Sequence, residues 1–374
     1  MTGRGRTDPL AERERALGLY RGCLLGGAVG DALGAPIEFF NIDEIHRYFG
    51  REGLTHYVPA FGGVGRITDD TQMTLFTAEG LLRAWVRGTL KGISSFSGVV
   101  SRAYIRWLET QGEKTDQGLE DEPDEEKGWL IQHRELFDRR APGLTCLSAL
   151  KEMEGVGRPA RNDSKGCGGV MRVAPVGLLM ARRGRDYHGS AFSTGCELSA
   201  LTHGHPSGIL PGGVLAALTF SLVGGRSLRD ALRHAKAMLV GQRDADETLL
   251  ALARAEALAD SSIAKEEAIE RLGQGWVAEE ALAIAVYCAL VSDNFRDAVL
   301  LSINHSGDSD STGAITGNLV GAMLGEAAIP PEWLEPLELR DVIAEIAEDL
   351  YSYIDWAMGE DHVRDRIWPK YPGF

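Results

Sequence analysis

GAITGNLVGAMLG, residues 313 to 325, carries a glycine at every fourth position. The same period occurs in GCLLGGAVGDALG, residues 22 to 34. Four residues is close to one turn of an α-helix, so each segment would present a bare glycine stripe along one side of a helix. A glycine inside a helix costs up to about 1 kcal/mol relative to alanine, so four in register indicate that a neighbouring backbone comes close. We expect both stripes in the buried centre of a compact helical bundle, where they could pack against each other.

The other long apolar segments also have helical periodicity. Residues 213–223, 277–291 and 339–358 are rich in alanine, leucine and glutamate, with apolar positions three and four apart, and strand signals are scarce. The pattern predicts an all-α fold. Because no Pro/Ser/Gly-rich linker divides the chain, we expect a single compact domain, residues 20–374, after an N-terminal extension, residues 1–19. An acidic loop insertion is expected at about residues 109–127.

Composition restricts the class of protein. The 374 residues are 44% hydrophobic and 25% charged, as in an ordinary globular protein. The net charge of -15 disfavours nucleic acid as a partner. The five cysteines are odd in number and form no CxxC pair, so we expect reduced thiols and a cytoplasmic location. We recognise no signal peptide, and the apolar stretch at residues 22–36 is short and contains Asp31, so we expect no membrane partner.

Two short clusters combine carboxylates with hydroxyl groups. TDDT, residues 68–71, precedes a helix expected to start near Gln72, and DSDST, residues 308–312, precedes one expected to start near Gly313. Helix capping explains one such residue at each helix start. Two carboxylates with flanking hydroxyls at both starts match instead the oxygen ligands that hard cations require. Two magnesium ions would balance the four negative charges of Asp69, Asp70, Asp308 and Asp310.

Two other kinds of site fit less well. DSDST matches the D-x-D-x-[TV] motif of haloacid-dehalogenase-type phosphatases, but that motif ends a buried strand near the N-terminus of an α/β domain. His203 and His205, in LTHGHP, could bind zinc, but no HExxH motif or thiolate cluster accompanies them. A structural or substrate-contacting role therefore suits His203 better.

Six segments, in order along the chain, resemble the ADP-ribosylglycohydrolase family. They are GCLLGGAVGDALGAPIEF, ITDDTQM, KGCGGVMRVAPVG, LTHGHP, GWVAEEALAIAVYCAL and HSGDSDSTGAITGNLVGAMLG, and the match runs from about Arg21 to about Met358. The resemblance implies an all-α fold with a central dinuclear magnesium site, which manganese could also fill. It also implies a hydrolase that removes ADP-ribose from modified proteins.

The resemblance assigns roles to individual residues. It implies metal ligands at Thr68, Asp69, Asp70, Asp308, Asp310 and Ser311. It implies substrate contacts along the diphosphate for Lys165, Gly166, Cys167 and Gly168, and near the ribose for His203. Taken alone, GCGG at 166–169 would either let backbone N–H groups approach a diphosphate or form a plain turn. A glycosidic bond to ribose breaks through an oxocarbenium-like state, and the proton would then be handled by one of three catalytic candidates, Glu38, Asp70 or Asp310.

The linkage and the protein partner stay open at this level. Members of the family act on ADP-ribosyl-arginine, on ADP-ribosyl-serine or on small molecules, and HSGDSDSTG resembles the arginine-directed branch. Some members are immunity proteins against ADP-ribosylating toxins, so the arginine-rich extension could be a frayed terminus or an arm that docks on such a toxin. The remaining alternative is a non-catalytic ADP-ribose-binding or toxin-binding protein with the same fold. All six implied ligand positions carry oxygen side chains, which argues against that alternative.

Overall fold

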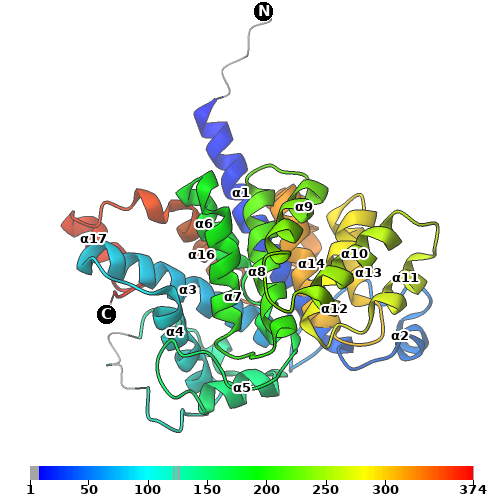
Figure 1. Cartoon of the computed structure of the whole chain (residues 1–374), viewed down its shortest axis with the longest axis horizontal. Coiled ribbons are helices and arrows are strands. Elements are labelled where there is room, and N and C mark those ends of the chain that lie inside the picture. Colours follow the sequence, from blue (N-terminus) through cyan, green and yellow to red (C-terminus); the bar gives the residue numbers. More distant parts are fainter. Residues whose placement is uncertain (1–7, 121–122, 124–126, 374) are drawn as a thin grey trace, which may run out of the picture.

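The fold is all-α, as the sequence predicts. The computed structural model describes residues 8–120, 123 and 127–373. These residues form seventeen α-helices with short 3-10 turns between them, and they contain no β-strand. In Figure 1 the first helix enters from a projecting N-terminal end and runs into the centre of the molecule, where later helices surround it.

The helices follow one another along the chain. The first seven are α1 (Pro9–Gly34), α2 (Ile42–Phe49), α3 (Asp69–Lys91), α4 (Phe96–Thr110), α5 (Leu144–Lys151), α6 (Ala174–Arg183) and α7 (His188–Ser199). The other ten are α8 (Pro206–Val223), α9 (Leu228–Leu239), α10 (Asp246–Ala259), α11 (Lys265–Leu272), α12 (Ala278–Val291), α13 (Phe295–Ile303), α14 (Ser309–Leu324), α15 (Pro331–Leu334), α16 (Arg340–Ser352) and α17 (Asp361–Ile367).

The two glycine stripes pack directly against each other in α1 and α14. A Cβ atom built on Gly317 would lie 1.9 Å from the carbonyl oxygen of Gly26, and one on Gly321 would lie 1.9 Å from that of Gly22. Near the other end of the contact, a Cβ on Gly30 would lie 2.0 Å from the carbonyl oxygen of Gly313. The pairing runs in opposite directions along the two chains, so the helices are antiparallel. The expected close approach of backbones is confirmed. Each helix needs glycine at these positions because the backbone of the other helix occupies the space of a side chain.

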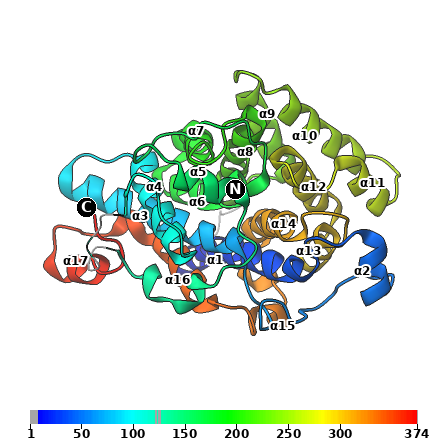
Figure 2. The same ribbon diagram turned by 90° about the horizontal axis from the view of Figure 1, so that it is seen from below.

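This helix pair is the centre of the bundle. Helices α6 and α8 contact α1 on one side and α16 contacts it on another, while α12 and α13 pack on α14. Figure 2 shows α1 crossing the middle of the molecule, with α6, α7 and α8 above it and α16 below. Because the pair is antiparallel, the N-terminal end of α14 lies beside the C-terminal end of α1. A Cβ on Gly34 would lie 2.3 Å from the carbonyl oxygen of Ser309.

Two helices begin earlier than the sequence predicts. Helix α3 starts at Asp69 and α14 starts at Ser309, because Thr68 and Asp308 are themselves the capping residues. The side chain of Thr68 accepts a hydrogen bond from the backbone N–H of Asp70, and that of Asp308 accepts one from Ser311. The acidic residues that follow each cap therefore lie in the first helical turn, where the positive end of the helix dipole favours negative charge.

The other helix predictions hold, with one shorter than expected. Residues 213–223 lie in α8 and 277–291 coincide with α12, but α16 ends at Ser352 and a 3-10 turn follows it. Among the described residues α8 is also long and apolar enough by itself to cross a membrane, and 83% of it is buried inside the protein. Such burial is typical of a core helix.

The extension and the acidic insertion are only partly described. Helix α1 is continuous from Pro9 to Gly34, so residues 9–19 are joined to the central helix without a break, and residues 1–7 lie outside the described structure. In the insertion, Glu109 and Thr110 still belong to α4. Glu113 then forms ion pairs with Lys151 at 2.9 Å and Arg139 at 3.2 Å, and residues 121–122 and 124–126 are not described.

We expect Gly317→Ala to lower the free energy of unfolding by about 3 kcal/mol, because the new methyl group overlaps the Gly26 carbonyl and the two helices must separate. Gly18→Ala is the matched control, since a Cβ there meets nothing within 4 Å. That change should leave stability unaltered or raise it by up to about 1 kcal/mol. Urea denaturation followed by far-UV circular dichroism measures both. Equal stability of the two variants would contradict a close helix contact at Gly317.

Candidate active site

A cavity of about 400 Å³ lies where the C-terminal end of α1 meets the N-terminal ends of α3 and α14. Five carboxylates line it: Glu38, Asp69, Asp70, Asp308 and Asp310. The rest of the lining includes Phe39, Pro142, Gly143, Leu144, Thr145, Cys146, Gly166, Cys167, Gly168, Met171, His203, Trp276 and Ser311. The two acidic clusters, distant in the sequence, thus face one cavity together with the glycine-rich segment and His203.

Two of the residues implied by the resemblance lie elsewhere. Thr68 is fully buried beneath the cavity wall and does not line the cavity. Lys165 also stays out of the lining: its ammonium group lies 2.6 Å from a carboxylate oxygen of Glu247. The main chain of Lys165 has a local role instead, because its carbonyl accepts a hydrogen bond from the backbone N–H of Ala278 at 2.8 Å. That contact holds the glycine-rich segment against the segment that carries Trp276.

Asp31, in α1, holds the acidic cluster at residues 68–71 from behind, a role that the sequence alone did not predict. Its carboxylate accepts hydrogen bonds from the backbone N–H groups of Thr68 and Thr71, at 3.1 Å each, and from both threonine hydroxyls. Burial and the charge of Asp310 raise the pKa of Asp31 to about 7, against the lowering effect of those hydrogen bonds. A lone aspartate within an otherwise apolar glycine stripe was the available signal for it.

Burial and mutual repulsion dominate the electrostatics of the cavity. Burial, followed by the charges of Asp310, Asp308 and Asp69, raises the pKa of Glu38 to about 10. The pKa values of Asp69, Asp70 and Asp308 are likewise raised well above the ordinary range, first by burial and then by neighbouring carboxylates. The pKa of Asp310 is raised by burial. Ionising all these groups together at neutral pH therefore requires a compensating positive charge.

The donor groups suit a hard cation in their chemistry. Oδ1 of Asp70 is buried without a hydrogen-bond partner. Among the described residues, the hydroxyl of Ser311 finds only sulfur atoms as acceptors, those of Cys167 at 3.6 Å and Met171 at 3.9 Å. Other oxygens are engaged, since Asp69 Oδ2 accepts from the backbone N–H of Gly143 at 3.0 Å. Within the described part of the chain, no three acidic, histidine or cysteine side chains are arranged to hold one ion. The oxygen donors are of the type that a hard cation requires, and the side chains that carry them would have to rotate to surround one ion.

The glycine-rich segment encloses the imidazole of His203. A Cβ on Gly166 would lie 3.2 Å from Nε2 of that ring, and one on Gly169 would lie 3.2 Å from Nδ1. On Gly168 it would lie 2.6 Å from the sulfur of Cys146 and 3.3 Å from the ring. The missing side chains therefore make room for the imidazole. Between these glycines, the thiol of Cys167 donates to Oδ2 of Asp308 at 2.7 Å, which joins this segment to the acidic cluster.

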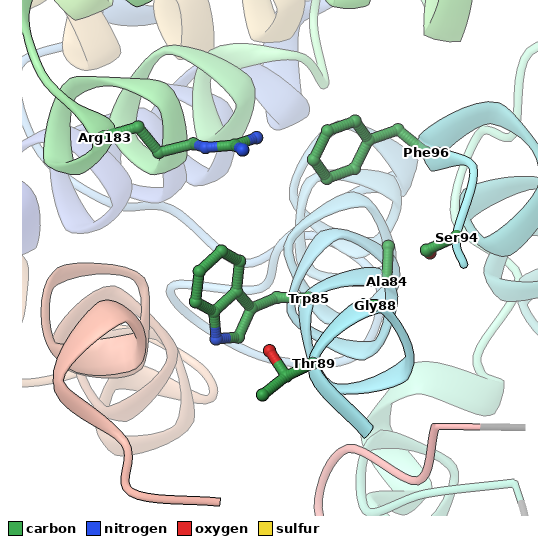
Figure 3. Close-up of a pocket in the computed structure, with 7 residues that line it drawn as sticks. All are labelled: Ala84, Trp85, Gly88, Thr89, Ser94, Phe96 and Arg183. Atoms are coloured by element: carbon green, nitrogen blue, oxygen red, sulfur yellow. The ribbon is translucent and has the colours of Figure 1, made fainter. Parts of the chain in front are cut away.

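A second cavity of about 400 Å³ lies between the C-terminal part of α3 and α6. Figure 3 shows Arg183 and Phe96 on opposite sides of it, with the indole ring of Trp85 below them. Its lining contains no carboxylate, histidine or cysteine. The acidic cavity, by contrast, combines several groups able to move protons or bind cations, so we take it as the candidate active site.

Comparison with known proteins agrees with this geometry. The sequence pattern of the ADP-ribosylglycohydrolase family matches residues 11–358, which include every residue that lines the acidic cavity. The chain belongs to the ADP-ribosylglycohydrolase family. Its enzyme class is accordingly that of a hydrolase of glycosidic ADP-ribose linkages.

Individual relatives of this ADP-ribosylglycohydrolase are distant. An uncharacterised protein of Archaeoglobus fulgidus is 29% identical over 89% of this chain and 96% of its own length. The ADP-ribosylarginine hydrolase Tri1 of Pseudomonas putida is 26% identical, over 91% of this chain and 79% of the relative. The ADP-ribosyl-[dinitrogen reductase] glycohydrolase of Rhodospirillum rubrum is 24% identical, over 87% and 91%. A solved structure described as an ADP-ribosylglycohydrolase-related protein complex shares the fold, with a TM-score of 0.66 and 24% identity, over 91% of this chain and 99% of that one.

We expect the protein, kept free of divalent cations, to lose stability as the pH rises. The pKa values of Asp31 and Glu38 are 3.8 and 4.5 in ordinary surroundings and about 7 and about 10 in the folded protein. A raised folded-state pKa stabilises the fold below the unfolded value, and this contribution is lost as the pH rises toward the folded value. Thermal melts in chelator at about pH 5 and about pH 8 should show it.

Glu38→Gln isolates one group in this experiment, because glutamine resembles the protonated side chain. Between the lower and the higher pH the variant should lose less stability than the wild type, since it has no carboxylate charge to bury at position 38. A pH dependence identical to that of the wild type would contradict the raised pKa of Glu38.

Proposed function

We propose that the protein is a magnesium-dependent hydrolase that removes ADP-ribose from arginine side chains of modified proteins, and that it acts in the cytoplasm. The observation that carries the proposal is the convergence of two carboxylate clusters and Glu38 on one cavity beside the glycine-rich segment. The name of the Tri1 relatives from Pseudomonas putida and Serratia proteamaculans, ADP-ribosylarginine hydrolase, supports the arginine linkage. The five free cysteines support a reducing compartment.

Two hard divalent cations, magnesium or manganese, would be held by Thr68, Asp69, Asp70, Asp308, Asp310 and Ser311. Such ions polarise sugar and water oxygens and offset the carboxylate charge. For Thr68 to take part, its hydroxyl would have to leave Oδ1 of Asp31, to which it now donates at 2.8 Å. Asp31 would then remain the acceptor for the backbone N–H groups of Thr68 and Thr71 and would keep the ligand segment in place.

The reaction replaces the bond between ribose C1′ and the guanidine nitrogen by a bond from C1′ to a water oxygen. Water gives up a proton, the leaving guanidine nitrogen gains one, and the products are free ADP-ribose and arginine. Asp70 and Asp310 would be committed to cations, whereas Glu38 belongs to neither cluster and lines the same cavity. We therefore assign the proton transfer to Glu38, with Asp70 and Asp310 orienting the sugar and the water.

The rim of the cavity supports a cationic acceptor. Phe39 and Trp276 stack with ring centroids 5.5 Å apart and planes 17° apart, and they are 72% and 37% exposed. Both line the cavity, next to Glu38. A guanidinium group is attracted by aromatic faces and by carboxylates, whereas a serine side chain carries no charge and is not attracted in this way. Serine-linked or small-molecule ADP-ribose is the alternative that a direct comparison of substrates would reveal.

We expect magnesium-dependent release of ADP-ribose from an ADP-ribosyl-arginine protein, and little from an ADP-ribosyl-serine peptide. Asp310→Ala should reduce the arginine reaction by at least about 100-fold, because it removes a cation ligand. Asp341→Ala is the matched control: Asp341 is also an aspartate in the first turn of a helix, but it is exposed on α16, and its loss should change nothing. Release from serine alone would replace the arginine assignment. Binding of ADP-ribose without any release would indicate the non-catalytic alternative.

We also propose that the N-terminal extension is an arm for a protein partner, such as an ADP-ribosylating toxin that this protein would neutralise. The start of α1 projects from the body of the protein in Figure 1, and Leu10 is 70% exposed there. Deleting residues 1–16 should abolish binding to such a toxin in a pull-down with purified proteins, while hydrolysis continues at the wild-type rate. Undiminished binding by the shortened protein would end this proposal and leave the hydrolase proposal intact.

A further inference from the structure

Arg172 is a buried cation directly behind the candidate active site. Its side chain is fully buried, and no carboxylate among the described residues forms an ion pair with it. Its guanidinium group instead donates to the sulfur of Cys146 at 3.3 Å and lies 4.4 Å from the centre of the Tyr104 ring. A charge buried among neutral groups is expensive to maintain, so its position calls for an explanation.

The strongest contact of Arg172 leads to the cavity through Thr202 and His203. Nη2 of Arg172 donates to the hydroxyl oxygen of Thr202 at 2.6 Å, and that oxygen lies 2.8 Å from Nδ1 of His203. A guanidinium group can only donate, so the threonine oxygen is the acceptor in the first bond. Its own hydrogen is then free to point to Nδ1, and acceptance from a cation strengthens that donation. On this network the proton of the neutral imidazole is on Nε2.

Nε2 of His203 faces the cavity and has no partner. It is buried without a hydrogen bond, and the ring is 1% exposed. Gly166 and Gly168, which surround this nitrogen, line the same cavity. Burial and the charge of Arg172 lower the pKa of His203 to about 3, so the ring stays neutral at physiological pH. A buried donor left without an acceptor is rare in proteins and indicates a place for a ligand atom.

We propose that Arg172 and Thr202 are positioning residues that keep the proton of His203 on Nε2, so that this N–H donates to a diphosphate oxygen of bound ADP-ribose. The inference rests on the ADP-ribose substrate of the proposed function. The cavity lining contains five carboxylates and no lysine or arginine, so no cationic side chain of the lining is available to the diphosphate. Arg172 supplies positive potential from behind, and His203 supplies a neutral donor at the surface of the cavity.

The test uses Thr202→Val, which removes the hydroxyl and keeps the branched shape. Isothermal titration should show about tenfold weaker binding of ADP-ribose, the usual effect of losing a hydrogen bond to a charged group, and unchanged binding of adenosine, which has no phosphate. Thr202→Ser, which keeps the hydroxyl, should restore the wild-type affinity. Thr219→Val is the control, because Thr219 is also fully buried but belongs to α8 and not to this network. Thermal melts establish that each variant is folded.

Long-range proton–nitrogen NMR spectra of the histidine rings give an independent readout that needs no turnover. The signals of His203 are assigned by their loss in His203→Gln. The wild type should carry the proton on Nε2, and Thr202→Val should show a mixture of the two neutral forms.

A proton on Nδ1 in the wild type, with the threonine hydroxyl turned to the sulfur of Cys146, would overturn the proposal. Unchanged ADP-ribose affinity in Thr202→Val, or an equal loss for adenosine, would overturn it as well. A wild type that binds ADP-ribose but hydrolyses no arginine linkage would count against the proposed function alone.

Discussion

The backbone contact between α1 and α14 is the constraint on which the rest of the structure depends. Glycines on both helices bring main-chain atoms so close that no side chain could be accommodated between them. The contact fixes the two helices in an antiparallel register, and the C-terminal end of α1 then meets the N-terminal end of α14. Asp31 and Glu38 come from the first of these ends, and Asp308 and Asp310 come from the second. Glycine lowers the stability of each helix, but it allows the helix contact that brings the carboxylates of the acidic cavity together.

The acidic cavity concentrates negative charge that the protein alone only partly offsets. The N-terminal ends of α3 and α14, and the backbone N–H groups of Ser311 and Gly143, stabilise some of the carboxylates. The raised pKa values of Glu38 and its neighbours show that the balance remains unfavourable to full ionisation. A site with such a deficit has a strong thermodynamic preference for cations, and its depth of burial excludes much of the water that would otherwise screen the charges.

The wall of the cavity around His203 has a different character. Around His203 the cavity offers glycine backbone and a neutral imidazole, while the nearby cation, Arg172, lies behind the wall. An acidic region and an uncharged region therefore share one cavity of about 400 Å³. Such a division suits a substrate in which one ribose lies between an anionic diphosphate and the glycosidic bond. Cys167, which contacts Asp308, marks the border between the two regions.

The sequence by itself determined the helical class and a close backbone approach at each glycine stripe, because these depend on local periodicity and on the absence of side chains. It offered the pairing of the two stripes as one possibility, and the resemblance to the family implied that the two acidic clusters meet. It placed the starts of α3 and α14 three to four residues late, since Thr68 and Asp308 are themselves the caps and the acidic residues after them already belong to the first helical turn. Only the tertiary structure decided that Asp31 anchors Thr68 and Thr71, that Lys165 turns away to Glu247, and that Arg172 and Thr202 stand behind His203. Those contacts join segments far apart in the chain, and the direction of each side chain depends on which neighbours the packing of the helices brings within reach.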